Sequence, residues 1–233
     1  MEDNRYLERR SEIENYFDRT AADAWSRLTS NAPVSRIRQT VREGRDAMRD
    51  LLLSWLPRDL RGRRLLDAGC GTGALSVEAA RRGAQVTAVD LSPTLVELAR
   101  QRLPAQIGEG SIDFRVGDMA AMELGAFDHV VAMDSLIHYD PDDGIRVLAG
   151  LAERVRGSML ITHAPSTPLL EIMHALGKVF PRNDRSPAIE PVSGQRLARR
   201  ITDEPRLRGW RPGRTQRISR GFYISQAMEL VRA

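Results

Sequence analysis

Disulfide bonds are excluded as a source of stability, because the 233-residue chain contains a single cysteine, Cys70. Cys70 lies inside a glycine-rich run, where a small residue filling a tight turn is a simpler interpretation than a nucleophile. Long apolar runs are also missing, so we expect no membrane-spanning helix. The opening residues Met1-Glu2-Asp3-Asn4-Arg5 are not typical of a signal or transit peptide. These absences predict a cytoplasmic protein of ordinary single-domain size.

Aromatic residues make up only 5% of the sequence, and they do not alternate with basic runs. This scarcity argues against a nucleic-acid groove, which pairs stacking rings with cationic side chains. Lysine is almost absent too, since Lys178 is the only lysine among 35 basic residues. Arginine therefore carries the net charge of +4, and its planar guanidinium suits carboxylates and phosphates. An acidic substrate or weak attraction to anionic lipid fits this composition, and so does an ordinary solvated surface.

The run most informative about function is Leu65-Leu66-Asp67-Ala68-Gly69-Cys70-Gly71-Thr72-Gly73. An apolar strand followed by three glycines and a helix-compatible segment predicts a tight turn that approaches a ligand closely. The pattern formally satisfies the dinucleotide fingerprint, in which a helix N-terminus receives a pyrophosphate. Asp67 argues against that reading, because it would repel a phosphate and attract an ammonium or sulfonium group. We therefore favour S-adenosylmethionine over a nicotinamide cofactor, bound by Asp67, Gly69, Gly71 and Gly73.

Acidic residues also follow the next apolar segments. Asp90 ends residues 84–90, about twenty residues after the loop, where a carboxylate binds both ribose hydroxyls of an adenosine. Leu91 would then form an apolar wall beside the adenosine. Asp118 ends a third predicted strand, and we expect it, with Met119, to meet the adenine amino group. A fourth strand is predicted over 127–133.

This succession of strand-end acids and a glycine loop, over residues 60–164, resembles a class I methyltransferase. The resemblance, together with alternating strands and helices, implies an α/β fold with a doubly wound, mostly parallel, seven-stranded Rossmann-like sheet. Helices are expected to start at Pro93 after Ser92 and at Pro141 after Asp140, because proline at the first helical position and a polar cap favour a helix start.

Four segments are expected along the chain: an N-terminal helical arm or cap (1–58), a Rossmann-like core that binds S-adenosylmethionine (59–164), a helical lid insertion (165–206) and the closing strands (207–233). A helix in the first segment presents one apolar face, with arginines on its other faces. That face consists of Ile37, Val41, Met48, Leu52 and Trp55. Burial against the sheet is the simplest account of the helix, and contact of residues 51–55 with a membrane surface is the alternative.

Five short segments resemble one methyltransferase family more closely than the glycine loop alone does: residues 15–17, 133–139, 165–168, 178–189 and 221–227. Together they resemble the magnesium-protoporphyrin IX methyltransferases of chlorophyll and bacteriochlorophyll biosynthesis, and the arginine-rich composition resembles the bacterial members. The resemblance implies methyl transfer from S-adenosylmethionine to one propionate of magnesium protoporphyrin IX, giving the monomethyl ester. It also implies that the substrate arrives from magnesium chelatase, so the porphyrin-binding subunit of that enzyme is a candidate partner, along with peripheral contact with the photosynthetic membrane.

The acceptor chemistry needs no strong base, because a propionate with a pKa near about 4.3 is already ionised at neutral pH. We therefore expect His138, with Tyr139 beside it, to position the acceptor or approach the substrate's magnesium, rather than to remove a proton. Asp134 follows the same strand and is expected to contact the cofactor. Tyr16 and Phe17 are expected to fold over the cofactor, with Tyr16 as a second candidate for orienting the carboxylate.

The predicted lid insertion carries further candidates. Arg182 and Arg185 are expected to hold the second propionate, because an arginine fork binds a carboxylate with two hydrogen bonds. Met173 and its apolar neighbours would line a porphyrin groove, or simply form the buried face of a lid helix. Nothing in the chain resembles a zinc site. Two alternatives keep the fold: another small acid or quinone precursor as acceptor, and a porphyrin carrier with a vestigial donor site.

Overall fold

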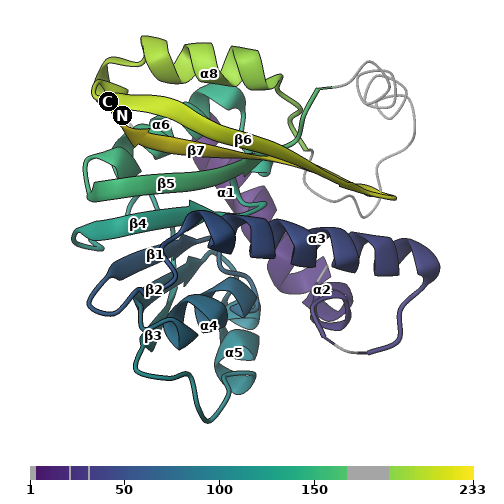
Figure 1. The fold of residues 1–233 in the computed structure, drawn as a ribbon. Coiled ribbons are helices and arrows are strands. Elements are labelled where there is room, and N and C mark those ends of the chain that lie inside the picture. The colour runs from purple at the N-terminus through teal and green to yellow at the C-terminus, as the bar shows by residue number, and fades with distance from the viewer. Residues whose placement is uncertain (1–3, 21, 31, 167–188) are drawn as a thin grey trace, which may run out of the picture.

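A seven-stranded sheet forms the centre of the computed structural model, in which residues 4–20, 22–30, 32–166 and 189–233 are described (Figure 1). The strand order is β3-β2-β1-β4-β5-β7-β6. Strands β1 to β5 are parallel, and β6 and β7 form an antiparallel hairpin at one edge. This architecture confirms the predicted doubly wound α/β fold. The strands are β1 (Arg64–Ala68), β2 (Gln85–Asp90), β3 (Ser111–Val116), β4 (Phe127–Ala132), β5 (Val155–His163), β6 (Trp210–Arg220) and β7 (Tyr223–Arg232).

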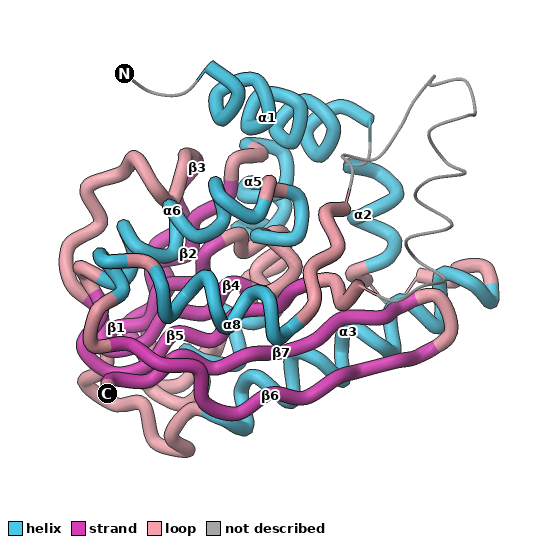
Figure 2. Tube along the Cα trace, turned by 90° about the horizontal axis from the view of Figure 1, so that it is seen from above, coloured by secondary structure: helices cyan, strands magenta, loops and turns pink. Residues whose placement is uncertain are grey.

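Helices cover both faces of the sheet, and successive residues of a strand point to opposite faces. Both faces are therefore lined with apolar side chains. Leu65 and Val131 join one core cluster, while their neighbours Leu66 and Val130 join the other. The first face is covered by α3 (Arg36–Trp55), α4 (Ala74–Arg81) and α5 (Pro93–Gln101), and the second by α6 (Pro141–Ala152) and α8 (Gly194–Asp203) (Figure 2).

Two of the helix starts follow the predicted capping chemistry. The Ser92 hydroxyl accepts a hydrogen bond from the Leu95 amide at 3.2 Å, and Pro93 is the first residue of α5. The Asp140 carboxylate accepts one from the Asp142 amide at 2.9 Å at the start of α6. Each cap pairs a backbone N–H group that the helix leaves without a partner, which is why these local signals are reliable.

The long helix α3 departs from the expected pattern at its N-terminal half. Met48 and Leu52 are fully buried, as the simpler account predicted, and burial of Leu52 and Leu53 removes them from any membrane surface. Ile37 is 54% exposed, however, because this half of α3 extends past the sheet beside the end of the β6–β7 hairpin (Figure 1). The prediction of one continuous buried face was therefore wrong at Ile37. None of the helices described is long and apolar enough to cross a membrane.

The N-terminal helices are attached where the parallel strands end. They are α1 (Asn4–Asn15), a π-helical turn η1 (Tyr16–Thr20) and α2 (Ala22–Leu28). Asp18 accepts hydrogen bonds from the Thr94 amide at 3.0 Å and the Ser92 hydroxyl at 3.2 Å, so η1 is fixed to the start of α5. Arg102 donates to the backbone carbonyl and hydroxyl oxygens of Ser26, each at 2.9 Å. These contacts hold the N-terminal segment over the carboxyl ends of the strands.

Candidate active site

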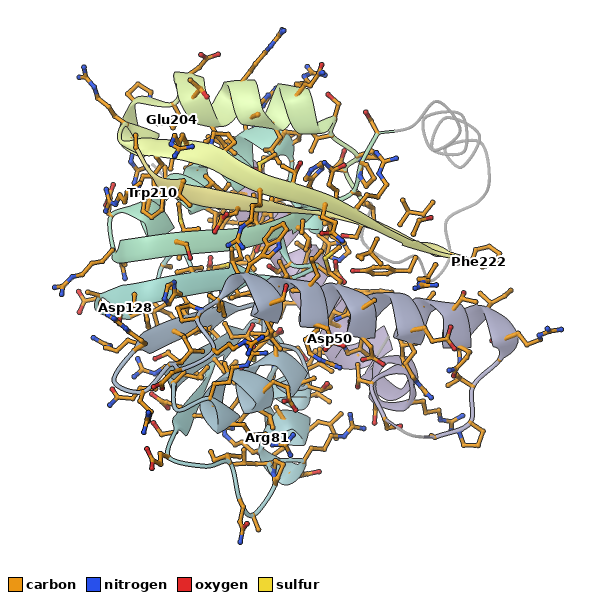
Figure 3. All side chains as sticks on the ribbon, viewed as in Figure 1. Asp50, Arg81, Asp128, Glu204, Trp210 and Phe222 are labelled. Carbon is orange, nitrogen blue, oxygen red and sulfur yellow. The ribbon has the colours of Figure 1, made fainter. Side chains whose placement is uncertain are left out.

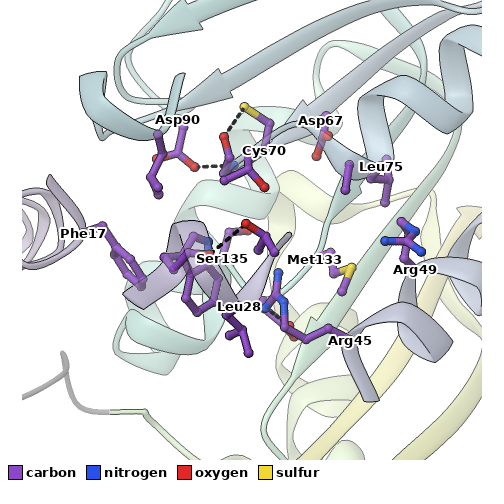
Figure 4. Close-up of a pocket in the computed structure, with 18 of the residues that line it drawn as sticks. Phe17, Leu28, Arg45, Arg49, Asp67, Cys70, Leu75, Asp90, Met133 and Ser135 are labelled. Atoms are coloured by element: carbon purple, nitrogen blue, oxygen red, sulfur yellow. Dashed lines mark hydrogen bonds and ion pairs between the residues drawn. The ribbon is translucent and has the colours of Figure 1, made fainter. Parts of the chain in front are cut away.

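A cavity of about 340 Å³ lies at the carboxyl ends of β1, β2 and β4, under the N-terminal helices (Figure 4). In doubly wound folds this edge of the sheet is where ligands bind. Many of the residues singled out in the sequence line it: Phe17, Asp67, Gly69, Gly71, Asp90, Leu91, Met119, Asp134, His138 and Tyr139. The structure thus brings together residues that are more than one hundred positions apart in the chain.

Asp67, at the end of β1, is the most deeply buried acid of the cavity, with 2% of its surface exposed. Its carboxylate accepts a hydrogen bond from the Ser76 hydroxyl of α4 at 2.6 Å. Burial raises the pKa of Asp67 to about 7, and the neighbouring charge of Asp90 adds to the shift while Ser76 opposes it. A cation placed here would favour the ionised form, since opposite charge lowers a carboxyl pKa.

The glycine loop lies directly against the segment that follows β4. Gly69 has a φ of +89°, and a Cβ built on it would lie 2.3 Å from the Cβ of Ser135. No other residue fits that position without moving the backbone. The Gly71 amide donates to the Asp90 carboxylate at 2.8 Å, which fixes the loop to the end of β2. Gly73 precedes α4 as its cap residue.

Asp90 is held with both carboxylate oxygens directed at backbone amides. One oxygen accepts from Gly71 and the other from the Ser92 amide at 3.0 Å. Burial raises the pKa of Asp90, against the lowering effect of these amide donors. Each carboxylate oxygen retains a second acceptor site, so the group can still bind two hydroxyls. Leu91 lies next to it on the cavity wall.

Asp118 is placed differently from the other strand-end acids, because it does not line the cavity, whereas Met119 does. The Tyr6 hydroxyl of α1 lies 3.0 and 2.8 Å from the two Asp118 carboxylate oxygens and donates to that group. The Tyr6 ring also stacks on Tyr139 with centroids 5.7 Å apart. Helix α1 therefore covers the carboxylate, and contact of Asp118 with adenine stays a prediction.

Asp134 is the centre of a buried polar network that sequence reasoning missed. Its carboxylate pairs with Arg45 of α3 at 2.5 Å and accepts hydrogen bonds from the hydroxyls of Thr162, Tyr223 and Ser225 at 3.1 to 3.3 Å. Its φ of +53° is unusual for a residue other than glycine. The network joins α3, β5 and β7 at one point. The alternation of Tyr223 and Ser225 along the last strand was the available signal.

His138 lies in the short 3₁₀ helix η2 (Leu136–His138), buried on the cavity wall. Its ring meets Phe17 edge-on with centroids 5.5 Å apart, and its backbone carbonyl accepts from Arg9 Nε at 2.7 Å. Tyr16 packs edge-on against Phe17 at 5.2 Å but does not line the cavity. Met173, Arg182 and Arg185 lie outside the described residues, so their roles stay predictions.

Two further groups line the cavity without having been assigned a role from the sequence. Trp25 of α2 faces the guanidinium of Arg45, whose Cζ lies 4.5 Å from the centre of the indole ring. Arg42, Asp46 and Arg49 also reach the cavity from α3, one or two turns apart. A charged face on an amphipathic helix ordinarily indicates a solvated surface, which is why the sequence pattern did not single them out.

Comparison with known proteins decides the family. A model of the magnesium-protoporphyrin IX methyltransferase C-terminus matches residues 132–232, and a methyltransferase domain model matches residues 65–157. The magnesium-protoporphyrin O-methyltransferase of Rhodobacter capsulatus is 50% identical over 96% of this chain and 97% of its own length. The chain belongs to the magnesium-protoporphyrin IX methyltransferase family.

Solved structures agree with this assignment. The crystal structure of magnesium protoporphyrin IX methyltransferase from Synechocystis PCC 6803 with bound S-adenosylhomocysteine superposes with a TM-score of 0.83 at 28% identity. The match covers 96% of this chain and 99% of that one. Membership confirms the predicted S-adenosylmethionine-dependent O-methyltransferase class and its cofactor. Ubiquinone biosynthesis O-methyltransferase of Xanthomonas oryzae is 42% identical, but over only 52% of each chain, so a quinone-type acceptor has the weaker support.

Proposed function

We propose that this cavity transfers a methyl group from S-adenosylmethionine to a propionate carboxylate of magnesium protoporphyrin IX. The observation that carries the proposal is the pair of acids, buried Asp67 and partly buried Asp90, on either side of the Gly69 turn in one cavity. This arrangement fits the methyl donor. Its ammonium and sulfonium groups are cations, which a nearby carboxylate and a backbone without side chains accommodate. Its ribose hydroxyls are bound by a second carboxylate.

Different residues of the cavity bind different groups of S-adenosylmethionine. Asp67 binds the ammonium group, and the backbone of Gly69 and Gly71 allows close approach. Asp90 binds the ribose hydroxyls. The apolar lining of the adenosine consists of Phe17, Leu91 and Met119. Asp134 stays a predicted donor contact, although Arg45 and Tyr223 already hold its carboxylate. Once bound, S-adenosylmethionine supplies a methyl group activated by positive charge on sulfur.

His138 orients the acceptor. The propionate is an anion before reaction, so the chain does not have to remove a proton from it. As its oxygen forms the bond to the methyl carbon, the carbon–sulfur bond breaks, and an anion and a cation become two neutral products. Because charge disappears, exclusion of water from the cavity by Phe17 and His138 favours the reaction. Tyr139 lies beside His138 on the same wall, and Tyr16 supports Phe17 from behind.

Several finer features belong to the same proposal. Arg182 and Arg185 hold the second propionate, with Met173 in the adjoining groove. The porphyrin-binding subunit of magnesium chelatase delivers the substrate. Peripheral contact with the photosynthetic membrane is supported by Phe222, which is 71% exposed between β6 and β7 (Figure 3). Ile37 is 54% exposed, and Arg36, Arg38 and Arg220, close to these two residues in the sequence, are exposed too. This surface replaces residues 51–55 as the candidate for that contact, since Leu52 and Leu53 are buried.

Turnover of labelled S-adenosylmethionine with magnesium protoporphyrin tests the proposal. We expect a product heavier by one methyl group in place of one proton, together with S-adenosylhomocysteine. A quinol precursor offered in parallel should give no product. Stoichiometric porphyrin binding without methylation would instead favour the carrier function, and methylation of the quinol alone would favour a different acceptor.

A further inference from the structure

The proposed methyl donor and its product differ in charge at one atom, the sulfur, and the inference below rests on that proposed function. S-adenosylmethionine carries a positive charge on this sulfur, whereas S-adenosylhomocysteine carries none. In the donor, the sulfur joins the amino acid portion to the ribose. With the ammonium group on Asp67 and the ribose on Asp90, the sulfonium group lies along the glycine loop between the two acids. In Figure 4, Asp67 and Asp90 lie on either side of Cys70, with Phe17 on the Asp90 side.

Trp25 of α2 lies directly against this loop. Its indole Nε1 is 3.4 Å from the point where a Cβ on Gly71 would lie. Trp25 also lines the cavity, so it faces the space that the donor occupies. A cation within about 6 Å of an indole ring is attracted by the negative charge of the ring face, and tryptophan gives the strongest interaction of this kind. Trp25 is therefore placed to meet a sulfonium group held over Gly71.

Phe17 and Trp25 form an aromatic corner in the cavity wall. Their ring centroids are 5.5 Å apart and their planes meet at 72°, and both residues line the cavity. The Phe17 ring also meets the His138 ring at a centroid distance of 5.5 Å. A methyl group beside this corner is therefore close to the residue that is proposed to orient the acceptor.

Tyr139 lines the cavity as well, but its contacts place it on the adenine side. Its ring stacks on Tyr6 with centroids 5.7 Å apart, and only 4% of its surface is exposed. The Tyr6 hydroxyl in turn donates to Asp118, the acid predicted to meet the adenine amino group. Within the described part of the chain, Phe17 and Trp25 are therefore the aromatic side chains available to the sulfonium group.

Trp25 is held in place before a ligand binds. Its backbone carbonyl accepts hydrogen bonds from the Thr29 amide at 2.9 Å and the Thr29 hydroxyl at 2.8 Å, and Arg102 of α5 donates to that hydroxyl at 2.9 Å. The guanidinium of Arg45 covers one face of the indole, with its Cζ 4.5 Å from the ring centre. Asp134 balances the charge of Arg45 through their ion pair at 2.5 Å, so the arginine supports the ring with little net repulsion of a second cation. A ring fixed in this way loses little freedom when it binds a ligand.

We infer that Trp25, with Phe17 beside it, recognises the sulfonium group of the methyl donor through a cation–π interaction and so distinguishes the charged donor from the neutral product. When the carbon–sulfur bond breaks, its electron pair stays on sulfur and the methyl group bonds to the acceptor oxygen. The sulfur is then a neutral thioether, and its attraction to the rings ends. This loss of attraction favours the replacement of the product by a new donor molecule.

Calorimetric titration with three compounds tests this directly: S-adenosylmethionine, S-adenosylhomocysteine and sinefungin, in which a carbon bearing an ammonium group replaces the sulfonium. Trp25→Leu should weaken binding of the two charged compounds about 5- to 30-fold, as expected for loss of a desolvated cation–π contact. Binding of neutral S-adenosylhomocysteine should change less than about 3-fold. The ratio of the affinities decides, because lost packing alone weakens all three compounds alike. Trp25→Phe keeps an aromatic face and should restore part of the selectivity.

Trp55→Leu is the matched control, since Trp55 also has an arginine over its ring, with the Cζ of Arg214 at 5.1 Å, but lies outside the cavity. It should leave all three affinities unchanged. Phe17→Leu, the second variant, should weaken the same two charged compounds by a smaller factor, and it keeps the test available where Trp25→Leu does not fold.

Equal weakening of all three compounds in the Trp25 and Phe17 variants would overturn the inference, and so would unchanged affinity for all three. An increase only in the KM for the porphyrin would assign Trp25 to the acceptor and also overturn it. Absence of S-adenosylmethionine binding in the unmodified chain would contradict the proposed function itself.

Discussion

At the scale of single residues, Asp67 combines deep burial with a proposed role, binding of an ammonium group, that requires negative charge. Its pKa is raised to about 7 by burial, so the ligand-free protein holds this carboxyl largely protonated below that pH. Binding of an ammonium group needs the carboxylate. Affinity for S-adenosylmethionine should therefore fall as the pH decreases through about 7 and level off above about 8, which calorimetry across pH 5.5 to 8.5 measures.

The stability of the ligand-free protein should change in the opposite direction. A carboxyl group whose folded pKa is raised above its unfolded value loses stability as the pH increases from about 4 to about 7. Asp67→Asn should remove this decline and also flatten the pH dependence of donor binding, at much lower affinity. An unchanged binding profile in this variant would assign the pH dependence to another group.

Gly62 and Gly69 both have a positive φ, and comparing them separates the backbone strain of an added side chain from its steric clash with a neighbour. Gly62 has a φ of +69° and nothing within 4 Å of an added Cβ, so Gly62→Ala carries only backbone strain of about 1–2 kcal/mol. Gly69→Ala adds a clash with Ser135, which also lines the cavity, so it should be more destabilising and should abolish donor binding. Urea denaturation and calorimetry compare the two variants. Equal stabilities and intact binding in Gly69→Ala would contradict the close contact between Gly69 and Ser135.

At the scale of helices and strands, one ion pair holds three elements together. Arg45 of α3 pairs with Asp134, which also accepts from β5 and β7, and the Asp134 side chain is only 6% exposed. Arg45→Met should destabilise the fold by about 3 kcal/mol, because it leaves a buried carboxylate without its cation. The double variant Arg45→Met/Asp134→Asn should recover part of that loss in urea denaturation. No recovery would show that Arg45 stabilises the fold mainly through Trp25.

Local and distant contacts differ in how far the sequence predicts them. The Ser92-Pro93 and Asp140-Pro141 helix starts were predictable because a cap involves residues two or three positions apart. The strand-end acids were predictable because parallel strands end at one edge. Tyr6 covering Asp118 was not, since 112 positions separate the two residues and no short pattern connects them. Ile37 was misassigned because helical periodicity does not reveal where a helix extends past its sheet.

At the scale of the whole molecule, one end combines exposed apolar side chains with basic residues and lacks nearby acidic ones in the sequence. The sequence has no acidic residue in 30–42 or 205–228. The backbone amide of Phe222 donates to the Thr40 hydroxyl at 3.4 Å, so the hairpin end lies on the exposed half of α3. Phe222 and Ile37 are exposed there with Arg36, Arg38, Arg217 and Arg220. Basic side chains around exposed apolar ones favour the surface of an anionic bilayer.

The basic apolar surface consists of Phe222, Ile37 and the exposed arginines Arg36, Arg38, Arg217 and Arg220. It should bind vesicles that contain phosphatidylglycerol, and it should not bind purely zwitterionic vesicles. Phe222→Ser/Ile37→Ser should reduce cosedimentation with the anionic vesicles several-fold, and added salt should weaken binding further, since it screens the arginines. Val116→Ser is the matched control, because Val116 is 43% exposed at the opposite edge of the sheet. Methylation of detergent-dispersed porphyrin should be unchanged in both variants, as neither touches the cavity. If the double variant sediments with anionic vesicles as well as the unmodified chain does, another surface mediates the contact.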